Sequence, residues 1–260
     1  MAASPLSPID VRSLRPSTSQ LYVYTDKTNG VWLRATLLSV ADKAGDALLV
    51  RLANAPPTSP GIRVEADKAT RASDAAQKGL PDMAQLDILH EAALLENIEA
   101  RYKRGDIYTA CGSLLVSVNP YKNLPLYSDE VITRYIEAGR SDARAVARSF
   151  GAGGSSASRH AGTILIGALG GSAPLPPHLF GLAECALSHM ARTGGAQMIL
   201  ISGESGAGKT EGTKYLLRYL MSRSIENTDA LPAGIASTKT PPQLDSATRI
   251  AWKNGGSPLD

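Results

Sequence analysis

Hydrophobic and polar residues near the start of the chain follow a β-strand pattern. They alternate along residues 21–40, and a second β-prone run occupies residues 46–53. Such alternation is typical of strands with one buried face. Asn29 and Gly30 interrupt the first run with residue types that accept the positive φ of a tight turn. Residues 61–66 supply one more strand candidate, so this region is predicted to form a small β-domain.

These strands set the predicted organisation of the first third of the chain. We expect a small β-barrel over residues 20–66, preceded by a disordered stretch at residues 1–19. Small residues and prolines surround the last strand, and we interpret residues 67–81 as a linker. From Asp82 onward the pattern changes to helical periodicity.

The first long helix is predicted from one apolar stripe. Leu94, Leu95, Ile98 and Tyr102 lie three or four residues apart. This spacing places them on one face of a helix, which Gly105 is positioned to end.

A strand, a helix and an irregular stretch are predicted next. The apolar residues within 113–120 are typical of a buried strand, which Pro120 ends. Residues 128–139 predict a helix with Ser128 as its N-cap and acidic residues in the first turn. We expect residues 139–174 to be a low-complexity loop or insertion, because they contain too little apolar surface to offset the entropy of ordering.

The last ordered region is predicted to contain a helix, a strand, a loop and a helix. The first helix has an apolar stripe, with Gly194 as its C-terminal cap. This stripe consists of Leu179, Leu182, Ala183, Ala186, Leu187 and Met190. Residues 196–202 predict a short apolar strand. The second helix is expected to present Thr213, Leu216, Leu217 and Leu220 on one face. We expect residues 225–260 to be a disordered tail.

The loop between that strand and the last helix matches the pattern G-x-x-x-x-G-K-[ST] in full. Its residues are Gly203, Glu204, Ser205, Gly206, Ala207, Gly208, Lys209 and Thr210. The glycines allow consecutive N–H groups to face one phosphate. Lys209 would place a positive charge at the β- and γ-phosphates, and the Thr210 hydroxyl would be a ligand for Mg²⁺. A glycine turn without a ligand is the alternative, which the flanking strand and helix disfavour.

Composition narrows the class of protein. The 260 residues carry a formal net charge of +3 without a run of five basic residues, so we expect no nucleic-acid partner. Cys111 and Cys185 lack the spacing of a metal site or a disulfide framework, and we interpret them as free thiols. No apolar run reaches the roughly 18 residues of a membrane span. The start also lacks the apolar core of a signal peptide. We therefore expect a cytoplasmic protein without membrane contact, and an organellar transit peptide is the less favoured alternative.

Hydrolysis of a nucleotide would need more than this loop. A P-loop hydrolase also uses an acidic residue at the end of a second apolar strand and a group that positions water. No apolar run in this chain ends in such an acid. The acids after Leu220 are Glu226, Asp229, Asp245 and Asp260, all in polar or proline-rich surroundings. We assign no catalytic residue.

Several stretches together resemble the motor domain of the myosin family. Residues 203–220 resemble its phosphate loop and the helix that follows, and residues 114–128 are similar to its adenine-binding segment. Residues 82–112 and 176–186 resemble the helices that precede these two motifs. Residues 20–66 are more faintly similar to the small barrel of myosin heads.

The resemblance implies a fold and a set of ligand contacts. The fold would be α/β, with an incomplete P-loop NTPase core over residues 82–224 preceded by a small SH3-like β-barrel. Residues 203–210 would hold the triphosphate of ATP with Mg²⁺. The purine would lie among Asn119, Pro120, Tyr121, Lys122 and Tyr127. Taken alone, a strand followed by a proline turn is the commoner meaning of the residues around Asn119.

Two departures from the family accompany the matches. The insertion at residues 139–174 replaces a short connection, and Gly212 stands where a better helix former is usual. Both nucleotide switches and the actin-binding region of a myosin find no counterpart in the sequence.

We therefore expect the N-terminal part of a myosin motor domain that binds ATP, in a family of actin-activated Mg-ATPases of the cytoskeleton. We expect no motor or ATPase activity from these residues alone, and no actin binding. The alternative is a non-enzymatic protein-interaction fragment that acts through the small β-barrel.

Overall fold

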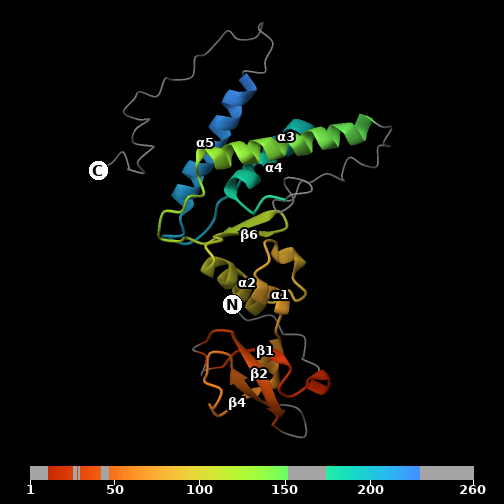
Figure 1. The fold of residues 1–260 in the computed structure, drawn as a ribbon, viewed down its shortest axis with the longest axis vertical. Helices are drawn as coiled ribbons and strands as arrows, with labels where there is room; N and C mark the ends of the chain where they lie inside the picture. The colour runs from red at the N-terminus through yellow and green to blue at the C-terminus, as the bar shows by residue number, and fades with distance from the viewer. Residues whose placement is uncertain (1–10, 26–27, 29, 42–46, 152–173, 229–260) are drawn as a thin grey trace, which may run out of the picture. The chain divides into compact units, whose positions relative to one another are not determined.

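The computed structural model of the chain describes residues 11–25, 28, 30–41, 47–151 and 174–228 (Figure 1). Residues 1–219 form one compact unit, and residues 220–260 form a second, whose described part is the end of the last helix. The strands are β1 (Gln20–Val23), β2 (Leu33–Val40), β3 (Ala47–Leu52), β4 (Ile62–Glu65), β5 (Ala69–Arg71), β6 (Tyr108–Cys111) and β7 (Leu114–Ser117). The α-helices are α1 (Asp74–Lys78), α2 (Glu91–Lys103), α3 (Asp129–Gly151), α4 (Leu179–Thr193) and α5 (Lys209–Thr228), and short 3-10 turns lie at Val11–Ser13, Ala66–Lys68 and Met83–Gln85.

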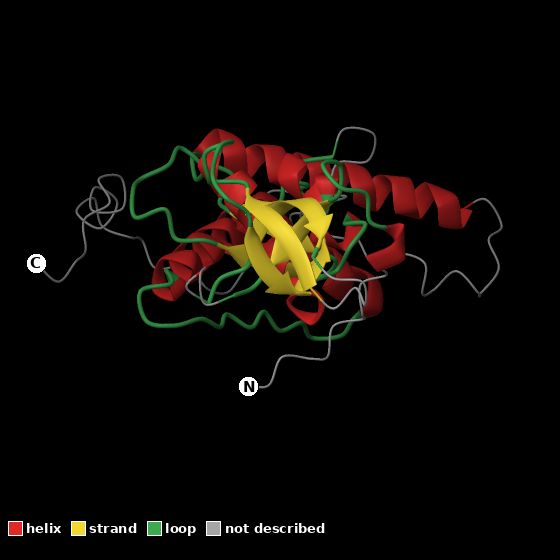
Figure 2. Cartoon of the chain, turned by 90° about the horizontal axis from the view of Figure 1, so that it is seen from below, coloured by secondary structure: helices red, strands yellow, loops and turns green. Residues whose placement is uncertain are grey.

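The N-terminal sheet is antiparallel, with strands in the order β4-β3-β2-β1-β5. Figure 2 shows its strands strongly twisted. Side chains alternate between the two faces of a strand, so Leu21 and Val23 of β1 enter the core of the sheet while Tyr22 faces the other side. The core of the sheet consists of Leu21, Val23, Ala35, Leu37, Leu48, Val50, Val64 and Ala69. The fold is thus mixed α/β, with an antiparallel sheet at its start.

The sheet extends past the predicted boundary at residue 66. Strand β5 pairs with β1, with Leu21 opposite Arg71, so the stretch interpreted as a linker completes the sheet. The same stretch contains α1. Val11 and Leu14 pack against the core of the sheet, so residues 11–19 are ordered where disorder was expected. Residues 1–10 lie outside the described residues.

Helix α2 buries a face that only partly matches the predicted one. Leu94 and Ile98 of the predicted stripe are partly buried and pack against the core. Leu95 and Tyr102 are exposed, whereas Ala93, Asn97 and Arg101 are buried. The prediction followed apolar side chains, but this helix buries two polar ones that find partners. Buried polar groups are tolerated when they are hydrogen-bonded.

The partners of these buried groups lie outside α2. The Asn97 side chain accepts from the Leu80 N–H at 2.6 Å and donates to the Leu80 carbonyl at 3.0 Å. Arg101 Nε donates to the Thr109 hydroxyl at 3.0 Å, and its Nη2 donates to the Tyr108 carbonyl at 2.9 Å. The Arg101 bonds fix α2 against the strand β6, and the Asn97 bonds fix it to the backbone of Leu80.

A buried ion pair joins the N-terminal sheet to α2. The Arg34 side chain on β2 is only 9% exposed and donates from Nε and Nη2 to the two oxygens of Glu96, both at 2.8 Å. The Tyr22 hydroxyl donates to the same carboxylate. Burial is the main reason that the pKa of Tyr22 rises to about 12. The carboxylate therefore binds two strands of the sheet at once.

The predicted buried strand at residues 113–120 is β7, which pairs antiparallel with β6 in a two-stranded sheet. Leu114 and Ser117 are exposed, so this strand is not buried as predicted. Gly112, with φ of 61°, makes the turn between the two strands. A strand in a two-stranded hairpin pairs with one neighbour only, so its other edge has no paired strand.

Helix α3 continues past its predicted end at residue 139 to Gly151, so the first part of the predicted insertion is helical. Gly139 lies inside the helix, where its missing Cβ leaves room for the Glu184 side chain of α4. The rest of the insertion, residues 152–173, lies outside the described residues. Helix α5 likewise extends to Thr228, into the predicted tail, and residues 229–260 are not described.

Helix α4 ends as predicted. Gly194 adopts φ of 70° and donates its N–H to the Met190 carbonyl. Its N-cap is His178, whose Nδ1 accepts the Phe180 N–H. Leu179 and Ala183 of the predicted stripe are buried, whereas Met190 is exposed.

The predicted strand at residues 196–202 is not a strand. Neither of the two sheets in the described part of the chain includes these residues. Leu200 is 83% exposed. A strand exists only when another strand accepts its hydrogen bonds, and an apolar run does not say whether that neighbour is present.

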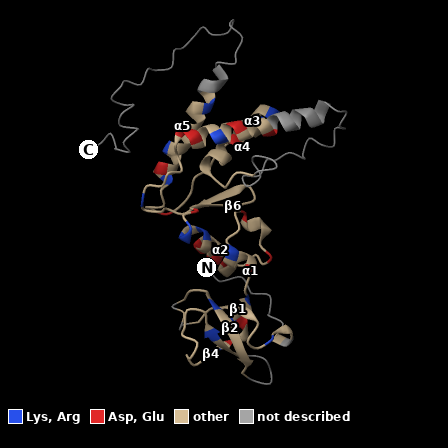
Figure 3. Cartoon of the chain, in the orientation of Figure 1, with Lys and Arg blue, Asp and Glu red and all other residues tan. Residues whose placement is uncertain are grey.

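The charges and the hydropathy of the helices agree with the ordinary composition of the chain. Basic and acidic side chains are interspersed on α3 and α5 (Figure 3). None of the described helices combines the length and the apolarity that a membrane crossing needs.

Candidate functional site

The glycine-rich loop leads directly into α5, which begins at Lys209. Gly206 and Gly208 have φ of 79° and 89°, which residues with a Cβ rarely adopt. The Gly212 N–H donates to the Gly208 carbonyl at 2.9 Å, which closes the first turn of the helix. The amides of Lys209 and Thr210 therefore have no partner within the helix. Together with the helix dipole, these amides suit an anion.

The Lys209 ammonium lies over the loop. Its Nζ donates to the carbonyl oxygens of Gly203 and Glu204, both at 2.8 Å. These two bonds hold a full positive charge against the loop. The residues are half-buried or exposed, so a ligand can reach them from solvent.

The predicted purine segment contacts this loop at Asn119. Its Nδ2 donates to the Gly206 carbonyl at 2.8 Å, and its Oδ1 accepts the Tyr121 N–H at 2.9 Å. Tyr121 has φ of 49° and is 82% exposed. A Cβ added to Gly206 would lie 3.8 Å from the Tyr121 hydroxyl oxygen. The structure thus brings Asn119 and Tyr121 to the glycine-rich loop.

The other residues of the purine segment lie differently. Pro120 is half-buried next to Asn119, and Lys122 is exposed without a described hydrogen bond to the loop. Tyr127 lies farther along, and its ring stacks on the ring of Tyr215 with centroids 3.5 Å apart and an interplanar angle of 6°. Burial is the main cause that raises the pKa of Tyr127. One face of the Tyr127 ring is therefore covered by α5.

An aromatic cluster supports this side of the site. Its members are Tyr108, Tyr127, Tyr135, His178, Phe180, Tyr215 and Tyr219. The hydroxyls of Tyr108 and Tyr127 share a hydrogen bond of 2.7 Å. Burial lowers the pKa of His178 to about 4. The imidazole is therefore neutral near pH 7.

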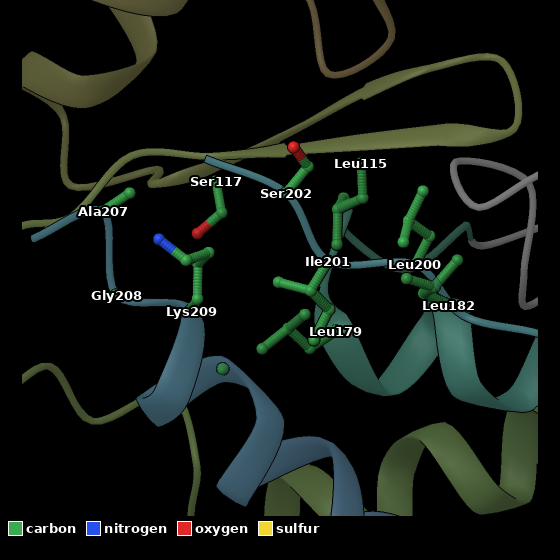
Figure 4. Close-up of a pocket in the computed structure, with 11 residues that line it drawn as sticks. Leu115, Ser117, Leu179, Leu182, Leu200, Ile201, Ser202, Ala207, Gly208 and Lys209 are labelled. Atoms are coloured by element: carbon green, nitrogen blue, oxygen red, sulfur yellow. The ribbon is translucent and has the colours of Figure 1, made fainter. Parts of the chain in front are cut away.

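A cavity of about 130 Å³ lies beside the start of α5 (Figure 4). Its walls come from β7, α4, residues 200–202 and the loop, and Figure 4 shows Leu179 and Lys209 among them. Cavities that enclose whole small molecules measure about 300–1,000 Å³. A nucleotide would therefore lie mainly outside this cavity, along the exposed loop.

Comparison with known proteins identifies the family. The family model "Myosin head (motor domain)" matches residues 80–240, more than half of the chain. The chain belongs to the myosin head family. The matched residues include both the loop at 203–210 and the segment at 119–127. The resemblance to the myosin motor domain is thereby confirmed.

Individual myosins agree with the family match. Myosin-H heavy chain of Dictyostelium discoideum is 34% identical over 188 residues, which cover 72% of this chain and 8% of that protein. Myosin-J heavy chain of the same organism is 33% identical over 218 residues, covering 82% and 8%. Myosin-VIIa of Drosophila melanogaster is 41% identical over 143 residues, covering 55% and 5%. The chain spans less than a tenth of the length of these relatives.

The N-terminal sheet of this myosin head chain lies before the matched range of the family model. The match to Myosin-J covers 82% of the chain, which is more than residues 80–260 make up. It therefore includes residues before residue 80, toward the sheet. Both parts of the chain therefore find counterparts in myosins.

Sequence reasoning missed two residues at this site, Tyr215 and Arg218. Both lie on α5 and contact Tyr127. Their spacing of three residues, which places them on one helix face, was the available signal. It was hidden because the prediction for α5 followed aliphatic residues, and one of these, Leu217, is exposed.

Proposed function

We propose that this myosin head chain binds ATP with Mg²⁺. The triphosphate would lie against Gly203–Thr210, and the purine would lie beside Asn119, Pro120, Tyr121, Lys122 and Tyr127. The hydrogen bond from Asn119 to the Gly206 carbonyl supports this proposal most strongly. It holds the segment proposed for the purine next to the loop proposed for the phosphates.

The phosphate contacts follow from the chemistry of the loop. The amides at the start of α5 and the Lys209 ammonium offer donors and positive charge to an anion. Among the described residues, no group of three or more His, Cys, Asp or Glu side chains could hold a metal ion. We therefore propose that Mg²⁺ arrives with the nucleotide and is held by phosphate oxygens and the Thr210 hydroxyl. The ion would neutralise phosphate charge.

The proposal extends to the fold and to the whole protein. We assign residues 82–224 to an incomplete P-loop NTPase core and the N-terminal sheet to an SH3-like barrel. Membership of the myosin head family makes actin-based movement in the cytoskeleton the proposed role of the whole protein. For this chain by itself we propose binding without turnover, because no apolar run in the sequence ends in an acid suited to Mg²⁺.

Calorimetric titration of the full chain with MgATP tests the proposal. Lys209→Ala should weaken binding by about a hundredfold, since it removes a charge-assisted contact to phosphate. Lys214→Ala is the matched control, because Lys214 lies on the same helix and pairs with Glu211 at an exposed position. The control should bind within about twofold of the unaltered chain.

Three results would contradict the proposal. The first is an unaltered chain that shows no heat of binding with MgATP, and the second is a Lys209→Ala variant that binds equally well. The third concerns turnover and is read from phosphate release. Steady release by the unaltered chain, abolished by Lys209→Ala, would show that the chain hydrolyses ATP. The alternative function, protein interaction through residues 20–66, stays a prediction.

A further inference from the structure

Two side chains of α5 reach the far end of the segment proposed for the purine. The Tyr215 ring stacks on the Tyr127 ring. One turn later, Arg218 Nη1 donates to the Tyr127 carbonyl at 2.8 Å and Nη2 donates to Asp129 Oδ1 at 2.6 Å. We infer that Tyr215 and Arg218 are positioning residues that hold Tyr127, and with it the purine segment, on the helix that carries the phosphate loop. This inference rests on the proposed function.

The geometry connects both parts of the site to one rigid element. Residues three positions apart on a helix share a face, so Tyr215 and Arg218 project together. Lys209 and Thr210 occupy the first turn of the same helix. A helix bends only gently, so residues along it keep nearly fixed distances from one another. The distance between the phosphate loop and Tyr127 is thus set by α5.

The purine segment depends on such contacts because it has no regular structure of its own. Residues 118–127 contain no helix or strand between β7 and α3. Asn119 attaches its start to the loop at Gly206. Tyr215 and Arg218 attach its end to α5. Both ends of the segment are therefore fastened to the loop and helix proposed for the phosphates.

The two positioning residues act on different groups. The Asp129 side chain is 89% exposed, so its ion pair with Arg218 adds little. The bond to the Tyr127 carbonyl is charge-assisted and partly buried, and it fixes the backbone. Tyr215 instead fixes the ring of Tyr127. Core packing of α5 is supplied by other residues, Leu216 and Tyr219.

Two ligands distinguish a positioning role of these residues from a general effect on stability. The full chain is titrated with MgATP. It is titrated separately, in the presence of Mg²⁺, with inorganic tripolyphosphate, a ligand without a purine. Tyr215→Ala and Arg218→Met should each raise the Kd for ATP by about tenfold. The Kd for tripolyphosphate should stay within about twofold, because the loop is unchanged. Tyr215→Phe keeps the stack and should restore ATP binding.

The control variant is Leu217→Ala. Leu217 lies between the two positioning residues on the same helix but is 53% exposed, so both ligands should bind it as they bind the unaltered chain. Equal weakening of ATP and tripolyphosphate by Tyr215→Ala, or no weakening of either, would overturn the inference. An unaltered chain that binds neither ligand would overturn the proposed function instead.

Amide hydrogen exchange tests the inference without any ligand. In the nucleotide-free chain, Tyr215→Ala and Arg218→Met should speed exchange of residues 121–128 relative to Leu217→Ala. Exchange in α2, which is held by its bonds to Leu80, Tyr108 and Thr109, should stay unchanged. Unchanged exchange at residues 121–128 in both variants would mean that α5 does not hold this segment, whatever the nucleotide data show.

Discussion

The Asn119 side chain donates to the carbonyl oxygen of Gly206 at 2.8 Å, across 87 positions of sequence. The same amide accepts the Tyr121 N–H through its oxygen. Both polar atoms of the Asn119 amide are therefore used, the oxygen to shape its own turn and the nitrogen to hold the glycine-rich loop.

Asn119→Asp should weaken ATP binding by about tenfold or more. The carboxylate oxygen would face the Gly206 carbonyl, where two acceptors repel, and would add negative charge beside the triphosphate. Titration with MgATP measures the loss. Asn123→Asp adds the same charge four residues later at an exposed position and should change the Kd by less than about threefold. Equal losses in both variants would mean that charge alone, rather than the bond to Gly206, is responsible.

Glu96→Ala should lower the free energy of unfolding by about 3 kcal/mol, because it leaves the buried Arg34 guanidinium without its main partner. Glu99→Ala is the control on the same helix. Its pair with Lys103 is exposed at both ends, and the loss should stay below about 0.5 kcal/mol. Urea unfolding of both variants measures the two values. Similar losses would show that the Arg34 pair is not special.

Two glycine substitutions should have opposite signs. Gly139→Ala forces its new Cβ against the buried Glu184 side chain, which accepts from the Tyr219 hydroxyl, and should cost about 1–3 kcal/mol. Gly212→Ala meets nothing closer than a Leu179 methyl group at 3.8 Å and should stabilise α5 by up to about 1 kcal/mol. Thermal unfolding distinguishes them. A Gly139→Ala variant as stable as the unaltered chain would contradict the close contact between α3 and α4.

Stability should fall with pH below neutrality because of His178. Burial lowers its folded pKa to about 4, while the unfolded value is about 6.5. Between these values the unfolded chain binds one more proton, so the free energy of unfolding decreases as the pH falls through this window. The effect is fully absent above about pH 7.

The contribution of His178 is isolated by His178→Asn. Asparagine can also cap α4 at the Phe180 N–H but does not titrate. Between pH 7.5 and pH 5, the unaltered chain should lose about 2 kcal/mol more than the variant. Urea unfolding at both pH values measures the difference. Parallel losses in the two proteins would show that the His178 pKa is not lowered.

The features that sequence predicted well are local ones. Gly194 ends α4 in the left-handed conformation expected of it. The glycine-rich loop leads into a helix that begins at Lys209. Gly30 adopts positive φ, as its turn requires. Each of these depends on residues within a few positions, because caps and turns are governed by nearby backbone groups.

The features that sequence predicted poorly depend on distant partners. Residues 196–202 are apolar, but a strand needs a neighbour, and the described sheets supply none. The helix predicted to end at residue 139 continues to Gly151, and the contact of Gly139 with Glu184 is invisible in the sequence. The stack of Tyr127 on Tyr215 likewise joins residues that no periodicity connects.

The sequence by itself determined the phosphate-loop pattern, the helix caps and the family of this chain, since all three are written in short runs of residue types. Only the tertiary structure decided which helix faces are buried. It buried Asn97 and Arg101 of α2 because each finds hydrogen-bond partners elsewhere in the chain. Whether a polar side chain is buried depends on its desolvation cost and on the contacts that offset this cost. These contacts come from groups that lie far apart in the sequence.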